Sequence, residues 1–239
     1  MRILTRLIAG VAFAAGLATA QMTAAAAADK LSVHIDGLGP DGRFGDTAAF
    51  CPPTDDTAKN VSPAVSWSAG PKGTRSYALL MTDPDVPADF SLINKADTKI
   101  PIEAPRVRVF HWVLDDIPAT VTSIAGAAES DRLVAGGKPI GPTPHGRRGA
   151  NVYTTFLAQV QGMAGTYGGY DGPCPPVNDH RVHRYSVRVV ALDVATLGLD
   201  GAFDGDAVEK AIIGHVLASG EAVASYTLNP ENRRNANSN

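Results

Sequence analysis

The residues SYALLMTDPDVP, numbered 76–87, indicate the fold class of this 239-residue chain. The first seven of them form a short run of the type that makes a buried β-strand. Successive side chains of a strand point to opposite faces, so one face carries Tyr77, Leu79, Met81 and Asp83. Two prolines then turn the chain out of the sheet directly after this row. We therefore expect a β protein with a carboxylate at the edge of its core.

Similar β-type runs recur between turns that contain glycine or proline. They lie at residues 31–35, 65–67, 107–114, 152–160 and 185–192. Apolar residues make up 44% of the chain and charged residues 19%, which is the balance of a globular protein. The sequence has no internal repeat and no separate linker. These features predict one loop-rich, mainly β domain over residues 29–230.

The C-terminal region contains the one convincing helix signal. Asp206 is a candidate cap, and Glu209 follows three residues later. Apolar side chains then recur on one face at Val208, Ile212 and Val216. Gly220 is expected to end this helix. A last strand is predicted over residues 223–228, and the polar tail 231–239 is expected to be disordered.

The N-terminus predicts export. Arg2 and Arg6 precede an apolar run over residues 7–18 that is too short to span a bilayer and ends in small residues. We expect a signal peptide over residues 1–28, cut after Ala20 or Ala28, and a periplasmic or secreted protein. An N-terminal membrane anchor or a buried apolar helix is the alternative. After cleavage no membrane segment is expected.

The net charge argues against a nucleic-acid partner. Loss of the leader removes two arginines and no acid, so the formal charge falls from −3 to −5. Binding to a phosphate backbone needs a clustered positive surface, which this sequence does not have. We therefore expect no nucleic-acid partner.

Two cysteines, Cys51 and Cys174, would enter an oxidising compartment together. A single disulfide between them is the natural prediction, with two unrelated buried thiols as the alternative. Cys174 lies in the glycine- and proline-rich segment 170–176. Prolines stiffen such a segment, and glycine allows a close backbone approach or exposes N–H groups to an anion.

Two further strands each place polar side chains on an apolar face. His111 shares its face with Val107, Val109 and Val113, and His183 and Tyr185 share theirs with Val187 and Val189. A buried polar group must be hydrogen-bonded or face a cavity. Together with Asp83, these residues predict a pocket whose N–H and O–H groups donate to an anion, while the carboxylate sets the tautomers or receives an ammonium. A core histidine that is merely hydrogen-bonded structure is the competing interpretation.

Four motifs occur in order at compatible spacing. They are Asp83-Pro84-Asp85-Val86-Pro87, His111-Trp112, Gly172-Pro173-Cys174-Pro175-Pro176 and His183-Arg184-Tyr185. This set resembles the phosphatidylethanolamine-binding protein family, in particular its bacterial Raf-kinase-inhibitor-like branch. The resemblance extends to residues 60–67, 73–76 and 214–218, and so spans nearly all of the mature chain.

The resemblance implies an antiparallel β-sandwich with a few peripheral helices, one of them near the C-terminus. It also implies a small pocket for phosphate, phosphorylated head groups or similar anions. By motif position the ligand-binding residues are Asp83, Asp85, His111, Gly172, Pro176, His183 and Tyr185. Two departures stand out: Val86 replaces the commoner alanine, and the segment 151–169 is longer than in the shortest bacterial members. We expect this segment to reshape the rim of the pocket.

Two other functions compete with a binding protein. Asp83 with His111 or His183 could act as an acid–base pair in hydrolysis or phosphoryl transfer. The sequence has no Gly-x-Ser-x-Gly, Ser-x-x-Lys or His-Glu-x-x-His motif, so we expect no enzyme, no metal and no cofactor. The second alternative is a protein that inhibits a kinase, protease or host factor through its loops, with a partner that the sequence does not identify.

Overall fold

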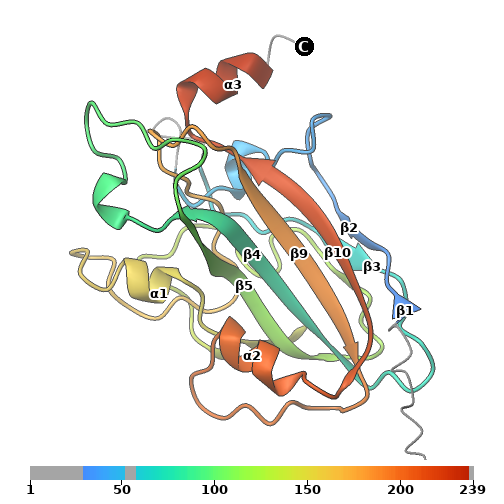
Figure 1. The fold of residues 1–239 in the computed structure, drawn as a ribbon. Coiled ribbons are helices and arrows are strands. Elements are labelled where there is room, and N and C mark those ends of the chain that lie inside the picture. The colour runs from blue at the N-terminus through green and yellow to red at the C-terminus, as the bar shows by residue number, and fades with distance from the viewer. Residues whose placement is uncertain (1–28, 52–57, 237–239) are drawn as a thin grey trace, which may run out of the picture.

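The computed structural model describes residues 29–51 and 58–236, and the predicted leader lies outside them. The strands form two sheets (Figure 1). The larger has the order β1-β10-β9-β4-β5-β8-β7, and the smaller has the order β2-β3-β6. Neighbouring strands are antiparallel except β1 and β10, which are parallel. The mainly β, two-sheet architecture is the predicted one.

The elements have the following bounds. The large sheet contains β1 (Asp29–Lys30), β4 (Ser76–Pro87), β5 (Arg106–Pro118), β7 (Gly141–Thr143), β8 (Gly146–Arg148), β9 (His183–Leu192) and β10 (Val216–Tyr226). The small sheet contains β2 (Val33–Ile35), β3 (Val65–Trp67) and β6 (Ser123–Ile124). The helices are α1 (Tyr153–Phe156), α2 (Gly205–Ala211) and α3 (Pro230–Ala236), with 3-10 turns η1 (Asp46–Ala48) and η2 (Phe90–Leu92).

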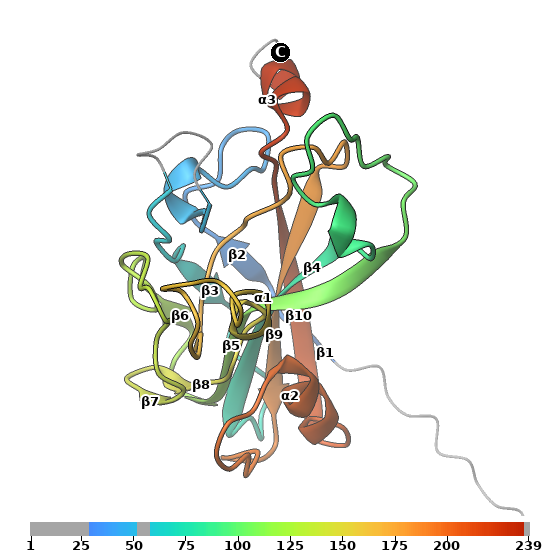
Figure 2. The same ribbon diagram turned by 90° about the vertical axis from the view of Figure 1, so that its left-hand side faces the viewer.

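The main core lies between the two sheets, with the small sheet to one side of the large one (Figure 2). As the alternation predicts, β4 contributes Tyr77, Leu79 and Met81 to it. The opposite face of the large sheet packs its own apolar side chains against Val208 and Ile212 at α2. In both views α2 and α3 lie at opposite ends of the large sheet.

A β-bulge changes the predicted orientation of His111. Adjacent residues of β4 pair with Trp112 and Phe110, which leaves His111 as an extra residue between them. Trp112 therefore faces the main core, while Phe110 and Val113 face the second one. Simple alternation predicts that His111 and Val113 share a face, and this prediction is wrong. Its ring lies edge-on to Tyr185, with ring centres 5.3 Å apart.

The C-terminal helix is shorter than predicted and has a different cap. Asp204, not Asp206, caps α2, because its side chain accepts a hydrogen bond from the amide of Ala207 at 2.9 Å. The helix ends at Ala211, and Val216 already begins β10. Gly220 lies inside that strand. A Cβ there would stand 2.1 Å from the carbonyl oxygen of Leu31, so the glycine serves the close approach of the chain beside β10.

Two further local predictions are wrong. The run at residues 152–160 forms α1 and turns instead of a strand. The tail that was expected to be disordered forms α3 up to Ala236, and residues 237–239 lie outside the described part. An ion pair between Arg233 and Asp46, at 2.8 Å, ties α3 to η1.

Within residues 29–51 and 58–236, no helix has both the length and the apolar character that a membrane crossing requires.

Candidate functional site

A cavity of about 170 Å³ lies where β4, β5 and β9 meet the loop at residues 172–182. Its polar lining consists of Asp83, Asn94, His111 and His183. Its apolar lining consists of Phe50, Cys51, Val86, Ile93, Tyr153, Phe156, Leu157, Cys174 and Pro176. Of the seven residues predicted to bind ligand, the structure brings Asp83, His111, Pro176 and His183 to this cavity. Asp85, Gly172 and Tyr185 are buried next to these residues but do not line it.

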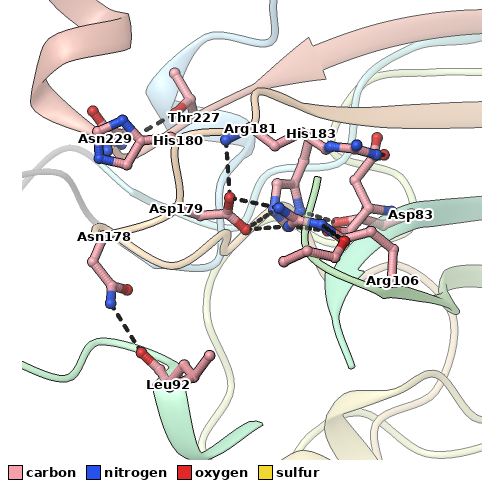
Figure 3. A network of polar contacts seen from close by, with 12 residues as sticks. Asp83, Leu92, Arg106, Asn178, Asp179, His180, Arg181, His183, Thr227 and Asn229 are labelled. Carbon is pink, nitrogen blue, oxygen red and sulfur yellow. Dashed lines mark hydrogen bonds and ion pairs between the residues drawn. The ribbon is translucent and has the colours of Figure 1, made fainter. Parts of the chain in front are cut away.

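His183 is held between two carboxylates (Figure 3). Its Nδ1 lies 2.7 Å from Asp83 Oδ2, and its Nε2 lies 3.1 Å from Asp179 Oδ2. Both ring nitrogens therefore carry a proton. Burial by itself lowers the pKa of His183, but the hydrogen bonds to Asp179 and Asp83 outweigh it and raise the pKa to about 9. Both N–H groups of His183 are used within the protein, and its donation to a ligand stays a prediction.

Asp179 and Arg106 extend this network, and the sequence analysis missed both. The Arg106 guanidinium forms two hydrogen bonds to the Asp179 carboxylate, one of them from Nη2 at 3.1 Å. Burial opposes ionisation of Asp179, yet the bonds from His183 and Arg106 hold its pKa below the usual value. Charges of alternating sign thus run from Arg106 through Asp179 and His183 to Asp83 (Figure 3). No sequence pattern pairs residues 73 positions apart, so only the fold reveals this ion pair.

The Asp85 carboxylate is hydrogen-bonded within the protein and does not line the cavity. Its carboxylate accepts hydrogen bonds from the backbone and guanidinium of Arg184 at 2.9–3.0 Å, and from Arg181 at 3.0 Å. Burial raises the pKa of Asp85, but these bonds outweigh it and lower the pKa to about 2. The Asp85 amide also donates to Asp83 Oδ1 at 2.8 Å. Asp85 therefore joins β4 to β9 and orients Asp83.

His111 has one ring nitrogen engaged with the protein. Its Nδ1 lies 3.0 Å from the carbonyl oxygen of Asp171, so Nδ1 carries a proton. Burial lowers the pKa of His111, although the nearby Asp83 carboxylate opposes this effect. In the neutral ring, Nε2 then presents a lone pair, 4.0 Å from Asp83 Oδ2. Protonation of Nε2 would turn it into a donor at the cavity.

A second buried network, also missed from the sequence, supports His111. The Asp171 carboxylate accepts hydrogen bonds from Asn60 and Lys138, both at 2.6 Å, and from Asn151 at 2.8 Å. Asn60 and Asp171 lie in segments that the motif analysis had singled out, but Lys138 has no local signal. This network fixes the carbonyl group that orients the His111 ring.

Gly172 positions the loop beside the cavity. Its amide donates to Asn60 Oδ1 at 2.8 Å, and its carbonyl accepts from the Tyr153 hydroxyl at 2.7 Å. A Cβ at this position would lie 1.8 Å from the carbonyl oxygen of Ala48. The glycine is therefore required by backbone packing.

Tyr185 is fully buried beside His111 and His183, and its hydroxyl makes no hydrogen bond of ordinary geometry among the described residues, although the Asp83 carboxylate lies near enough to interact with it. Burial raises its pKa well above the usual value, and the negative charge of Asp83 adds to this effect. A buried hydroxyl without a partner is uncommon in folded proteins. Tyr185 therefore remains a candidate donor that a small movement could bring to a ligand.

Cys51 and Cys174 form the predicted disulfide, with their Cα atoms 4.9 Å apart. It joins segments 123 residues apart and forms part of the cavity wall. Beside it, the Phe50 amide donates to the carbonyl oxygen of Pro173 at 2.9 Å. The bridge thus fixes the loop at residues 172–182 against the N-terminal segment.

Comparisons with known proteins identify relatives of this chain. A sequence model of the phosphatidylethanolamine-binding protein family matches residues 40–227. A UPF0098 protein of Aquifex aeolicus is 30% identical over 168 residues, which cover 70% of this chain and 75% of that protein. The UPF0098 protein YbcL of Escherichia coli is 28% identical over 169 residues, which cover 71% and 73%. The crystal structure of YbcL, described as a new member of the mammalian PEBP family, superposes with a TM-score of 0.58 at 24% identity, over 83% of this chain and 98% of that one. The chain therefore belongs to the phosphatidylethanolamine-binding protein family.

Proposed function

We propose that this protein binds a small anion, such as phosphate or a phosphorylated head group, and does not transform it. The proposal rests on the arrangement of the histidines in the cavity. Of the two described histidines that line it, only His111 has a ring nitrogen, Nε2, without a hydrogen bond to the protein, and Asp83 Oδ2 lies 4.0 Å from this atom. An anion that approaches Nε2 favours the protonated ring. Binding should therefore take up one proton at His111.

Further donors are close to this position. Asn94 lines the cavity, and its Oδ1 accepts from the Val177 amide at 2.9 Å, which leaves its NH₂ group available. The buried Tyr185 hydroxyl is a third candidate. No arginine or lysine is among the described residues that line the cavity. Without such a bidentate clamp, we expect a Kd on the order of micromolar to millimolar.

The lining also supports binding over catalysis. Its two cysteines are joined in the disulfide, and no serine or threonine hydroxyl is among the described lining residues. The Asp83 carboxylate is already engaged in a hydrogen bond with the doubly protonated His183. An acid–base reaction through Asp83 and His111 is the second candidate function. It would need a nucleophile delivered from outside the cavity.

The disulfide supports an oxidising compartment, in keeping with the predicted leader. We propose that the protein is exported to the periplasm or secreted. A role as a Raf-kinase-inhibitor-like regulator of a protein partner is part of the same proposal, and the cavity would then modulate the contact with that partner.

The experiment measures sulfate and phosphate binding by calorimetry from pH 5 to 8. Sulfate keeps its charge over this range, so a change in its affinity reports on the protein. We expect tighter binding toward low pH, and proton uptake that is visible when buffers of different ionisation enthalpy are compared. His111→Asn keeps a donor for the Asp171 carbonyl but removes Nε2, and it should abolish the pH dependence. His215→Gln is the matched control, since His215 pairs with Asp193 away from the cavity.

Two results would contradict the proposal. One is sulfate affinity that is flat with pH and equal in the parent and His111→Asn. The other is turnover of a phosphoester that disappears in Asp83→Asn, which would establish the acid–base enzyme instead.

A further inference from the structure

An apolar groove of about 490 Å³ opens beside the cavity. It is lined by Phe90, Ile93, Thr155 and Phe156. Ile93 and Phe156 also line the cavity itself, so the two spaces adjoin at these side chains. A ligand that fills the cavity and extends outward would pass over these two side chains.

The groove brings together two exposed aromatic side chains. Phe90 is 53% exposed and Phe156 is 38% exposed, and their rings lie edge-to-face with centres 5.4 Å apart. The other four phenylalanines of the described residues are all buried. Both exposed phenylalanines thus meet at the mouth of the same cavity. A clustered apolar patch of this kind is typical of a ligand or partner site.

The walls of the groove are held in place by the protein itself. The Asn178 side chain donates to the carbonyl oxygen of Leu92 at 2.9 Å (Figure 3). It also donates to the carbonyl oxygen of Thr98 at 2.9 Å, and together these bonds tie the segment carrying Phe90 to the cavity loop. On the other side, the Tyr153 hydroxyl ties the start of α1 to the same loop. The groove is therefore preformed, which reduces the entropic cost of occupying it.

The cavity is too small for more than a head group. Its volume is about 170 Å³, against about 490 Å³ for the groove. An anionic group of the size of phosphate fills much of it. Any larger substituent must leave through the mouth.

We propose that the ligand is an anion that carries one aryl or short alkyl group, with the anion in the cavity and the apolar group against Phe90, Ile93 and Phe156. This inference rests on the proposed anion binding. It adds the substrate class, and it assigns selectivity to Phe90, a residue that lines the groove but not the cavity.

The test compares inorganic phosphate, methyl phosphate, butyl phosphate and phenyl phosphate in the full chain by calorimetry. Each methylene buried on the groove should raise affinity by roughly two- to fourfold. Butyl and phenyl phosphate should thus bind about tenfold or more tightly than methyl phosphate. Phe90→Ala should remove most of this gain while leaving the affinity for inorganic phosphate within about twofold.

The control is Ile213→Ala, which removes an apolar side chain that is 75% exposed and lies in neither space. It should keep the full gain. Equal affinity for methyl, butyl and phenyl phosphate overturns the inference, as does a gain that persists in Phe90→Ala. In either case binding of inorganic phosphate still upholds the proposed function. Failure of all four compounds to bind removes the proposed function together with the inference.

Discussion

The doubly protonated His183 predicts a specific loss of stability at alkaline pH. Its pKa is raised to about 9 in the folded protein, against about 6.5 when unfolded. A group whose folded pKa is raised stabilises the protein fully below its unfolded pKa, and this contribution is lost as the pH rises through its folded pKa. At about 1.4 kcal/mol per pKa unit, His183 contributes roughly 3 kcal/mol below pH 6.5. About 2 kcal/mol of it should disappear between pH 7.5 and 9.5.

The assay is urea unfolding at several pH values in this window, together with an NMR titration of the His183 ring. His183→Gln should be less stable at neutral pH and should lack the alkaline loss, because it cannot release the proton. A ring that titrates near pH 6.5 refutes the reasoning. The same alkaline loss in parent and variant refutes it as well, since the loss would then come from another group.

Three further perturbations test the rest of the structure. The Asp115 carboxyl is buried, with an ion pair to Arg147 at 3.7 Å, and burial outweighs this pair and raises its pKa to about 7. Its folded pKa is thus raised, so stability is lost as the pH rises toward 7. Asp115→Asn should therefore increase the free energy of unfolding at pH 8 by up to about 4 kcal/mol, and unchanged urea midpoints would disprove this. Replacing Cys51 and Cys174 together by serine should cost roughly 4 to 5 kcal/mol, measured against the oxidised parent, and a parent that reducing agent does not destabilise would contradict it. Gly172→Ala should lower the melting temperature and weaken phosphate binding, because its Cβ would meet a backbone oxygen at 1.8 Å. Gly45→Ala should be close to neutral, because the nearest atom to its Cβ would be the Thr47 side-chain oxygen at 3.8 Å.

Buried charges at the cavity are tolerated because they alternate in sign. Arg106 and His183 are cations, Asp179 and Asp83 are anions, and each is hydrogen-bonded to its neighbour in the series. Removing one member would leave a buried charge without a partner, which commonly costs 3 to 5 kcal/mol. Variants at Asp179 or Arg106 therefore test stability more than ligand contact.

Local patterning was sufficient for much of the fold. Alternation identified β4 and its core face, and the two cysteines and the ordered motifs led to the disulfide and the family. The same reasoning failed at the C-terminal helix, where Asp204 caps instead of Asp206 and β10 begins at Val216. Apolar side chains at Val208, Ile212 and Val216 have helical spacing. Val216 nevertheless pairs with β9, and its backbone takes part in a strand instead of a helix.

The sequence by itself pointed to Asp83, His111, Pro176 and His183 as members of the site, because side-chain periodicity and motif spacing are local properties of the chain. Only the tertiary structure decided what each of them does. The bulge at His111 depends on the register between β4 and β5, and it turns that ring toward the cavity side. The carboxylate of Asp179 uses the second N–H group of His183, while Asp171 holds the first nitrogen of His111. Protonation states follow from such contacts between distant segments, and a linear pattern contains no information about their geometry.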